Sequence, residues 1–161
     1  ADMIVHHYPD LLKSDPVYSS KAKRLSDRTY EFTQFLVDKL GLTNVGAKYN
    51  GNATYHPCCH GLRNLNLVQQ PSTLLDNVED LEQVVLPCAE ECCGFGGLFS
   101  VRMSEISGAM LDKKLSHIEE SGANVLIAGD VGCIIHMQGG LRRRGSNIQV
   151  KHIAEILNGC D

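Results

Sequence analysis

The chain has 161 residues, of which 43% are hydrophobic and 21% are charged, and its formal net charge at pH 7 is -4. This length suits one domain with a substantial core, which we place over residues 1–161. The acidic balance argues against nucleic acid as a partner, and no apolar run approaches the roughly 20 residues that a membrane-spanning helix needs. The first residues also lack the order of a signal peptide, so we expect a cytoplasmic protein.

Apolar residues recur at helical spacing from Tyr18 to Leu40, which predicts one amphipathic helix over residues 19–40. Downstream, short extended runs alternate with helical ones. The expected strands are 53–56, 81–86, 125–128 and 148–152, and the expected helices are 72–78, 104–121, 133–143 and a short one ending at 157. The uniformly apolar run 125–128 is typical of a strand buried on both faces. This alternation predicts an α/β fold, an open, mostly parallel, Rossmann-like sheet with helices on both faces.

Adjacent cysteines are the most informative residues of the chain. Two pairs, Cys58-Cys59 and Cys92-Cys93, are followed by Cys133. Vicinal cysteines hardly bridge to each other, because such a disulfide is strained, and paired thiolates are soft ligands that select zinc, copper(I) or iron–sulfur clusters. An odd set of seven cysteines in a cytosolic context favours metal or redox chemistry over a disulfide framework. Cys160, one residue from the end, is expected to be a bystander.

The expected strands bring these cysteines to one edge of the sheet. Candidate ligands follow three strands: Cys58 and Cys59 the first, Cys88, Cys92 and Cys93 the second, and Cys133 the third. Ligands of open α/β sheets bind outside the carboxyl ends of the strands, so the sequence predicts a metal site there. The histidines best placed to join it are His60 and His136, the latter three residues after Cys133 at the start of a helix.

Residues 90–100 form a glycine-rich loop around the second cysteine pair. Gly94 and Gly96 allow positive φ and close backbone approach, so we expect its N–H groups to donate to cluster sulfides. A simpler interpretation is a tight strand-to-helix turn. A dinucleotide-binding fingerprint is excluded, because its third glycine would fall at Phe99.

Several kinds of chemistry remain open from the residues alone. Four thiolates, or three with His136, would satisfy a closed tetrahedral zinc site, and the same residues suit an iron–sulfur cluster. A nucleophilic cysteine enzyme would use Cys59 with His60, or Cys133 with His136, as thiolate and base, but it accounts for one thiol among several. We assign no catalytic residue.

Four stretches carry a resemblance to a known family: Tyr55 to Arg63 around Cys59-His60-Gly61-Leu62, Glu91 to Ser100, Glu105 to Met110, and His152 to Leu157. Over nearly the whole chain the sequence resembles the cysteine-rich CCG domain family. That family includes iron–sulfur subunits of heterodisulfide reductase, anaerobic glycerol-3-phosphate dehydrogenase, and lactate- and glycolate-oxidising systems, and the likeness is strongest to the lactate group. The resemblance implies that Cys59, Cys92, Cys93 and Cys133 bind a cluster of the 4Fe-4S type.

The resemblance further implies a subunit that relays electrons in a multi-subunit complex oxidising L-lactate to pyruvate, with the other subunits as partners. The alternatives are a zinc-stabilised assembly module and a thiol redox subunit of the heterodisulfide reductase kind. Family members usually carry two copies of the motif, and this chain has one and does not begin with Met. We therefore expect it to be the C-terminal part of a two-copy protein, with an N-terminal half missing.

Two residues depart from the family pattern. His136 occupies the last position of the family's C-x-x-C, and Pro57-Cys58 places an additional thiol before Cys59. Cys58, Cys88 and His136 are therefore kept as further candidate ligands, and Cys58 or Cys88 would have to compensate for the cysteine that His136 replaces.

Overall fold

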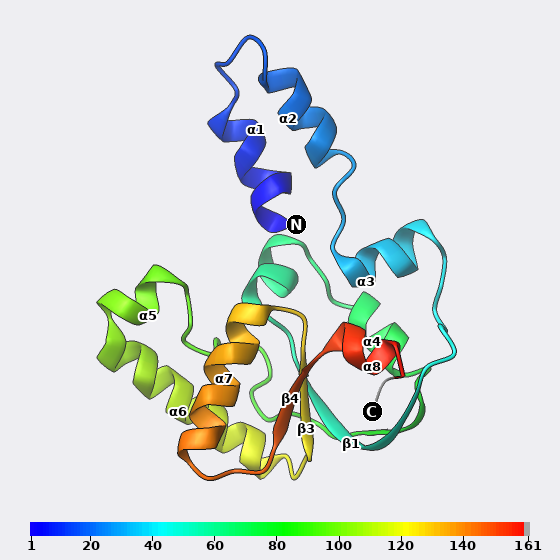
Figure 1. Ribbon diagram of the computed structural model, residues 1–161, viewed down its shortest axis with the longest axis vertical. Helices are drawn as coiled ribbons and strands as arrows, with labels where there is room; N and C mark the ends of the chain where they lie inside the picture. The colour runs from blue at the N-terminus through cyan, green and yellow to red at the C-terminus, as the bar shows by residue number, and fades with distance from the viewer. Residues whose placement is uncertain (160–161) are drawn as a thin grey trace.

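The computed structural model describes residues 1–159, and its centre is a four-stranded sheet (Figure 1). Cys160 lies outside the described residues. The strands are β1 (Lys48–His56), β2 (Glu79–Gln83), β3 (Val125–Ala128) and β4 (Gln149–His152). They are ordered β2-β1-β3-β4, and every neighbouring pair is parallel. The expected open, parallel α/β sheet is confirmed.

Helices cover both faces of this sheet (Figure 1). The helices are α1 (Tyr8–Leu11), α2 (Ser19–Ser26), α3 (Phe32–Gln34), α4 (Gln70–Leu75), α5 (Leu98–Arg102), α6 (Ser104–Glu120), α7 (Val131–Arg143) and α8 (Ile153–Leu157), with π-helical turns at Met3–His7, Phe35–Lys39 and His60–Asn64. Helices α6 and α7 supply the core on one face, and α4 and α8 supply it on the other.

Strand β3 shows why the sequence builds two layers. Its four residues are all buried, with Leu126 and Ala128 in the core beneath α6 and α7, and Val125 and Ile127 in the core beneath α4 and α8. Successive side chains of a strand point to opposite faces, so a central strand covered on both sides must be apolar throughout. The burial expected for residues 125–128 is therefore confirmed.

The N-terminal helices project from the sheet (Figure 1), and here one expectation is wrong. The continuous helix expected over residues 19–40 is interrupted, because α2 ends at Ser26 and α3 begins at Phe32. Glu31 between them is extended, with φ −71° and ψ 156°, and its carboxylate accepts hydrogen bonds from the amides of Thr33 and Gln34. A side chain that caps a new helix competes with continuation of the old one.

The chain connections place a crevice at one end of the sheet. From β1 the chain passes through α4 to β2 on one side, and from β2 it returns through α6 to β3 on the other side of β1. The carboxyl ends of β1 and β3, where His56 is paired in register with Ala128, therefore form the point at which the strand order reverses. Such a point is where open α/β sheets bind ligands. Within residues 1–159, no helix combines the length and apolarity needed to cross a bilayer.

Candidate metal centre

A cavity of about 360 Å³ lies at the carboxyl ends of β1 and β3. Its lining comprises Cys58, Cys59, His60, Cys92, Cys93, Phe95, Gly96, Gly97, Asp130, Gly132 and Cys133. Five of the six cysteines in the described part of the chain thus surround one space. The edge of the sheet at which the sequence predicted a metal site is where the structure places them.

Two connections of the sheet position the cysteines at residues 58, 59 and 133. Strand β1 ends at His56, and Cys58 and Cys59 follow at the start of the turn His60–Asn64. Cys133 lies in the first turn of α7, where its amide donates to the Asp130 carboxylate at 3.1 Å. Asp130 is therefore both the N-cap of α7 and the anchor of the backbone that carries Cys133.

The glycine-rich loop holds the other two cysteines. Gly94 has φ +88°, and a Cβ at this position would lie 2.6 Å from the carbonyl oxygen of Ser107, so only glycine fits. The Ser107 hydroxyl donates to the Gly94 carbonyl at 2.8 Å, which fastens the loop to α6. The Gly94 amide donates to the sulfur of Cys92, Sγ, at 3.3 Å. Donation from the loop amides to cluster sulfides stays a prediction.

Cys93 and Cys133 form a buried inner pair, with their Sγ atoms 3.4 Å apart. The pKa of Cys93 falls to about 4, chiefly because the Cys133 thiol donates a hydrogen bond to its sulfur. Contacts with Cys58 and Cys93 raise the pKa of Cys133. The pair therefore carries one thiolate at neutral pH, which is the form of cysteine that binds metal.

Cys59 and Cys92 are half-buried. Burial, reinforced by the neighbouring Cys92, raises the pKa of Cys59 to about 11. Without a metal this thiol keeps its proton at neutral pH, so binding of a cation here would release protons.

Lys114 supplies a positive charge behind the glycine-rich loop. The residue is 1% exposed, and its ammonium donates to the carbonyls of Cys88 and Ala89 at 2.8 Å and 3.1 Å. Burial lowers its pKa, while the negative charge of Glu91, followed by smaller contributions from the cysteines nearby, opposes that change. A buried ammonium held by carbonyls offsets negative charge on the thiolates. Sequence reasoning missed it, although Lys114 follows Leu111 by three residues on the apolar face of α6.

His56 is the second residue that sequence reasoning undervalued. It is fully buried, and its ring nitrogens bond to no nitrogen or oxygen atom of the described residues; the ring lies beside the Cys93 sulfur and helps to lower the pKa of that thiol. One ring nitrogen, Cys93 Sγ and Cys133 Sγ all lie within 4.8 Å of one another. A buried polar group without a partner costs about 1–3 kcal/mol, so this imidazole has a reason to be there that the protein atoms alone do not supply.

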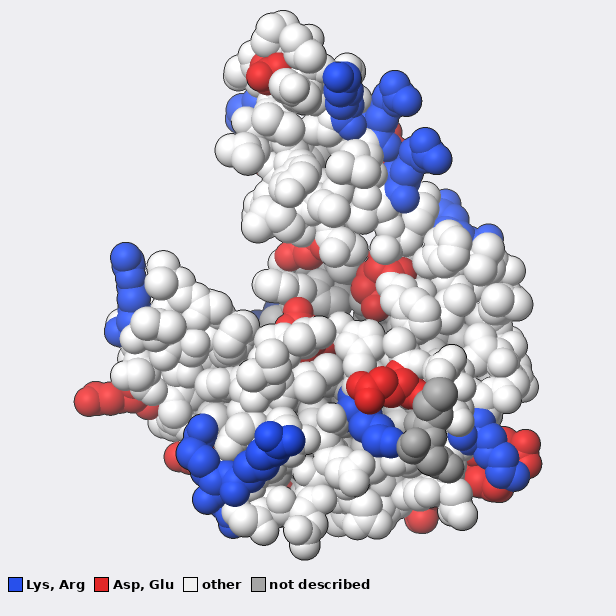
Figure 2. All heavy atoms as spheres, in the orientation of Figure 1, with Lys and Arg blue, Asp and Glu red and all other residues white. Residues whose placement is uncertain are grey.

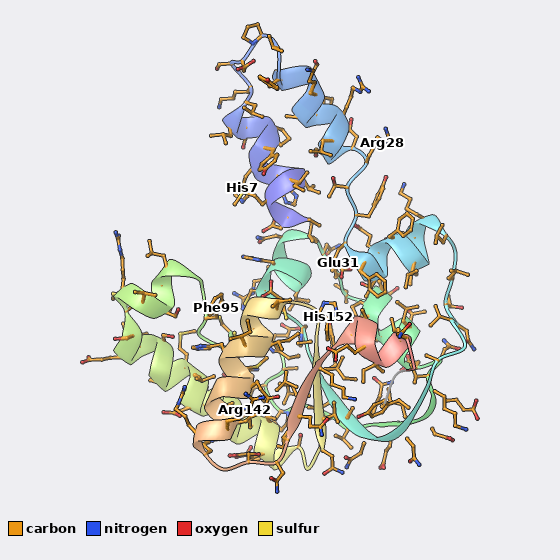
Figure 3. All side chains as sticks on the ribbon, viewed as in Figure 1. His7, Arg28, Glu31, Phe95, Arg142 and His152 are labelled. Carbon is orange, nitrogen blue, oxygen red and sulfur yellow. The ribbon has the colours of Figure 1, made fainter. Side chains whose placement is uncertain are left out.

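The other candidates occupy different places. Cys88 is exposed and does not line the cavity; it lies with Glu91 and His117 in a separate group whose ligand atoms are within 4.8 Å of one another. His136 is not in the lining either, and its ring centroid lies 5.7 Å from that of Phe95, which is on the loop before α5 and near the start of α7 (Figure 3). Cys58 is in the lining and donates to the His56 carbonyl at 3.7 Å.

A second cavity, of about 310 Å³, adjoins the first, since Cys58, His60 and Asp130 line both. It extends to Asp2 and Glu31 of the N-terminal segment. Acidic side chains gather in the hollow between this segment and the sheet (Figure 2), where Glu31 is labelled in Figure 3. A partner that reached the cysteines from this side would meet negative charge.

The residues of the five-cysteine cavity fit a metal group bound by thiolates. Four ligands close in a single tetrahedral ion, and five cysteines line this cavity, so the residues can hold either an ion or a cluster. The loop amides and the buried ammonium of Lys114 suit an anionic centre held by thiolates.

Comparison with known proteins identifies the family of the segment that carries this site. The family model of the cysteine-rich domain CCG matches residues 53–138, from β1 to α7. The chain belongs to the cysteine-rich CCG domain family. The matched segment includes every residue that lines the five-cysteine cavity.

The curated relatives point to the lactate branch of the family, as the resemblance implied. The chain is 53% identical over 152 residues to lactate utilization protein A of Macrococcus caseolyticus, and 54% identical over 151 residues to that of Bacillus pumilus. It is 51% identical to that of Lysinibacillus sphaericus. Each match covers 94% of this chain, but only 62%, 63% and 66% of the respective relative.

Proposed function

We propose that this chain binds an iron–sulfur cluster of the 4Fe-4S type and relays electrons in a multi-subunit complex that oxidises L-lactate to pyruvate. The observation that carries the proposal is the meeting of five cysteines, from three separate segments, around one cavity at the switch point of the sheet. The lactate part rests on the names of relatives about half identical to this chain.

Within this proposal, Cys59, Cys92, Cys93 and Cys133 hold the cluster, and Cys58 is a further candidate. The cluster, when bound, supplies one-electron redox chemistry. The chain's own residues fix the thiolates, place the Gly94 amide beside the Cys92 sulfur, and balance negative charge with Lys114. We propose that the Gly96 amide also faces the cluster.

Oxidation of lactate to pyruvate releases two electrons and two protons. The sequence has no dinucleotide fingerprint, so we place the lactate site and the first electron acceptor on partner subunits. The curated relatives are longer than the matched segment, and we propose that the remaining part of such a protein, a further copy of the motif, is one of the partners. The proposed location is the cytoplasm.

The first test is metal analysis of anaerobically purified protein. We expect iron and acid-labile sulfide in near-equal amounts, visible absorbance, and loss of all three in Cys93→Ser. The matched control is Cys88→Ser, which removes an exposed thiol outside the cavity and is expected to retain the cluster. Zinc without sulfide would contradict the relay and support the assembly module.

The lactate assignment needs the complete complex. Anaerobic addition of L-lactate to the complex with its partner subunits is expected to reduce the cluster, seen as bleaching of its visible absorbance. The Cys93→Ser complex should show no bleaching. Reduction by glycolate and not by L-lactate would contradict this substrate, and thiol–disulfide turnover without partner subunits would favour the heterodisulfide-reductase-like alternative.

A further inference from the structure

His56 presents two nitrogen atoms to the interior of the protein. Neither bonds to a nitrogen or oxygen atom among residues 1–159, and the ring lies beside the Cys93 sulfur, whose pKa it helps to lower. The residue is fully buried at the last position of β1. Buried histidines in folded proteins ordinarily satisfy at least one nitrogen with a carbonyl, a carboxylate or a hydroxyl. Within the described chain this imidazole therefore lacks the hydrogen bond to oxygen that usually accompanies a buried histidine.

The strand geometry directs the ring toward the cysteines. His56 is paired in register with Ala128, and Tyr55 with Ile127. Ile127 and Tyr55 belong to the core beneath α4 and α8, whereas Ala128 belongs to the core that contains Cys93 and Cys133. Paired residues of parallel strands share a face, so the His56 ring lies on the cysteine side, where the small side chain of Ala128 leaves room for it.

The ring then meets the two most buried thiols of the site. Its nitrogen, Cys93 Sγ and Cys133 Sγ form one group with all separations within 4.8 Å. Neutral imidazole accompanies thiolate as a metal ligand, both at zinc and at some iron–sulfur centres. An unpartnered nitrogen beside two thiols is what a mixed ligand set requires.

The other two nearby histidines fit this role less well. The side chain of His60 is 67% exposed and lies 3.8 Å from the Asp130 carboxylate. His136 also has one buried nitrogen without a partner, Nε2, but its ring packs against Phe95 and is not in the group with Cys93 and Cys133. Both are matched controls, because each is a histidine close to the same centre.

We propose that His56 binds the metal centre directly through a ring nitrogen, beside Cys93 and Cys133, so that the ligand set is mixed thiolate and imidazole. The inference rests on the proposed function, since it concerns the same centre.

The test is pulsed electron paramagnetic resonance of anaerobically purified, reduced protein with natural or ¹⁵N-labelled histidine. We expect the strong hyperfine coupling of a directly bound nitrogen, shifted by the isotope, lost in His56→Gln and retained in His60→Gln and His136→Gln. Absence of such a coupling in the unsubstituted protein, or its loss in His136→Gln, would overturn the inference. If His56→Gln takes up no metal, retention of the coupling in the double variant His60→Gln with His136→Gln supports His56, and its loss overturns it.

Metal analysis of the same samples separates this inference from the proposed function. Iron and sulfide without a bound nitrogen would contradict only the proposed role of His56 and would leave the proposed function standing. Zinc without sulfide contradicts the relay, and X-ray absorption at the zinc edge then tests the nitrogen ligand in the same variants. A nitrogen scatterer lost only in His56→Gln supports the inference, and an all-sulfur shell in the unsubstituted protein overturns it.

Discussion

The sulfur atoms of Cys93 and Cys133 lie 3.4 Å apart, although the two residues are 40 positions apart in sequence. One comes from the glycine-rich loop after β2 and the other from the first turn of α7. Packing of both elements against β3 brings the thiols together, since Cys93, Cys133 and Leu126 share one buried core. The packing of the protein itself therefore brings part of the centre together.

The hydrogen bond within this pair gives a prediction for the metal-free protein. Replacing Cys133 by Ala removes the donor that holds the pKa of Cys93 at about 4, so that pKa should rise toward its ordinary value of 9. Acid titration of thiolate ultraviolet absorbance measures it. Cys88→Ala is the control, and an unchanged pKa of Cys93 in Cys133→Ala would contradict the hydrogen bond.

The same pair makes stability depend on pH. Between about pH 4 and pH 9 the unfolded chain keeps the Cys93 proton and the folded protein has lost it, so this residue makes the free energy of unfolding rise with pH across that range. Above pH 9 the raised pKa of Cys133 acts in the opposite direction. Denaturant unfolding at a series of pH values should show a shallower rise in metal-free Cys133→Ala.

Much of the architecture was accessible from the sequence, for physical reasons. A strand covered on both faces must be apolar throughout, and residues 125–128 are. Parallel strands end at a common edge, so cysteines after three different strands were expected to meet, and five of them do. Both inferences depend on the spacing of apolar residues and on the direction of the strands, and both can be predicted from the sequence.

The errors have a different origin. The helical spacing of apolar residues from Tyr18 to Leu40 is continuous, but the helix is not. The Glu31 carboxylate accepts hydrogen bonds from the amides that follow it, and this local cap outweighs the periodicity. His56 and Lys114 are polar residues at positions that face the interior, and the groups that lie beside them come from segments remote in sequence. Pattern alone marks such residues as exceptions, and only the tertiary structure shows what each one meets.

Gly94 offers a test of the loop geometry. In Gly94→Ala the new Cβ meets the Ser107 carbonyl oxygen at 2.6 Å on a backbone with φ +88°. Strain and overpacking together should lower the free energy of unfolding by about 3 kcal/mol, with weaker metal binding. Gly122→Ala is the control, because Gly122 also has positive φ but nothing within 4 Å of its Cβ position. There we expect a loss of about 1 kcal/mol, and equal losses in a denaturant titration would refute the steric argument.

Asp130 links helix capping to the site. Asp130→Ala removes the acceptor of the Cys133 amide at the start of α7 and should cost about 1 kcal/mol of stability. Because the same bond fixes the backbone of Cys133, metal affinity should fall as well. Asp130→Ser keeps a capping oxygen and should restore most of both. Thermal unfolding and competition with a chelator measure the two effects, and an Asp130→Ser variant as defective as Asp130→Ala would show that the cap is not the cause.

Lys114 and Lys113 are neighbours on α6, but their substitution should change stability by very different amounts. Lys114→Met keeps the buried volume but leaves the carbonyls of Cys88 and Ala89 without their donor, and we expect a loss of about 2 kcal/mol. Lys113 is exposed and pairs with Glu91, so Lys113→Met should change stability by less than about 0.5 kcal/mol.

In protein that carries the proposed cluster, Lys114→Met should also lower the reduction potential, because reduction adds negative charge beside a site that has lost a cation. Denaturant unfolding and a redox titration check both effects, and equal potential shifts in the two variants would mean that the buried ammonium has no special influence on the centre.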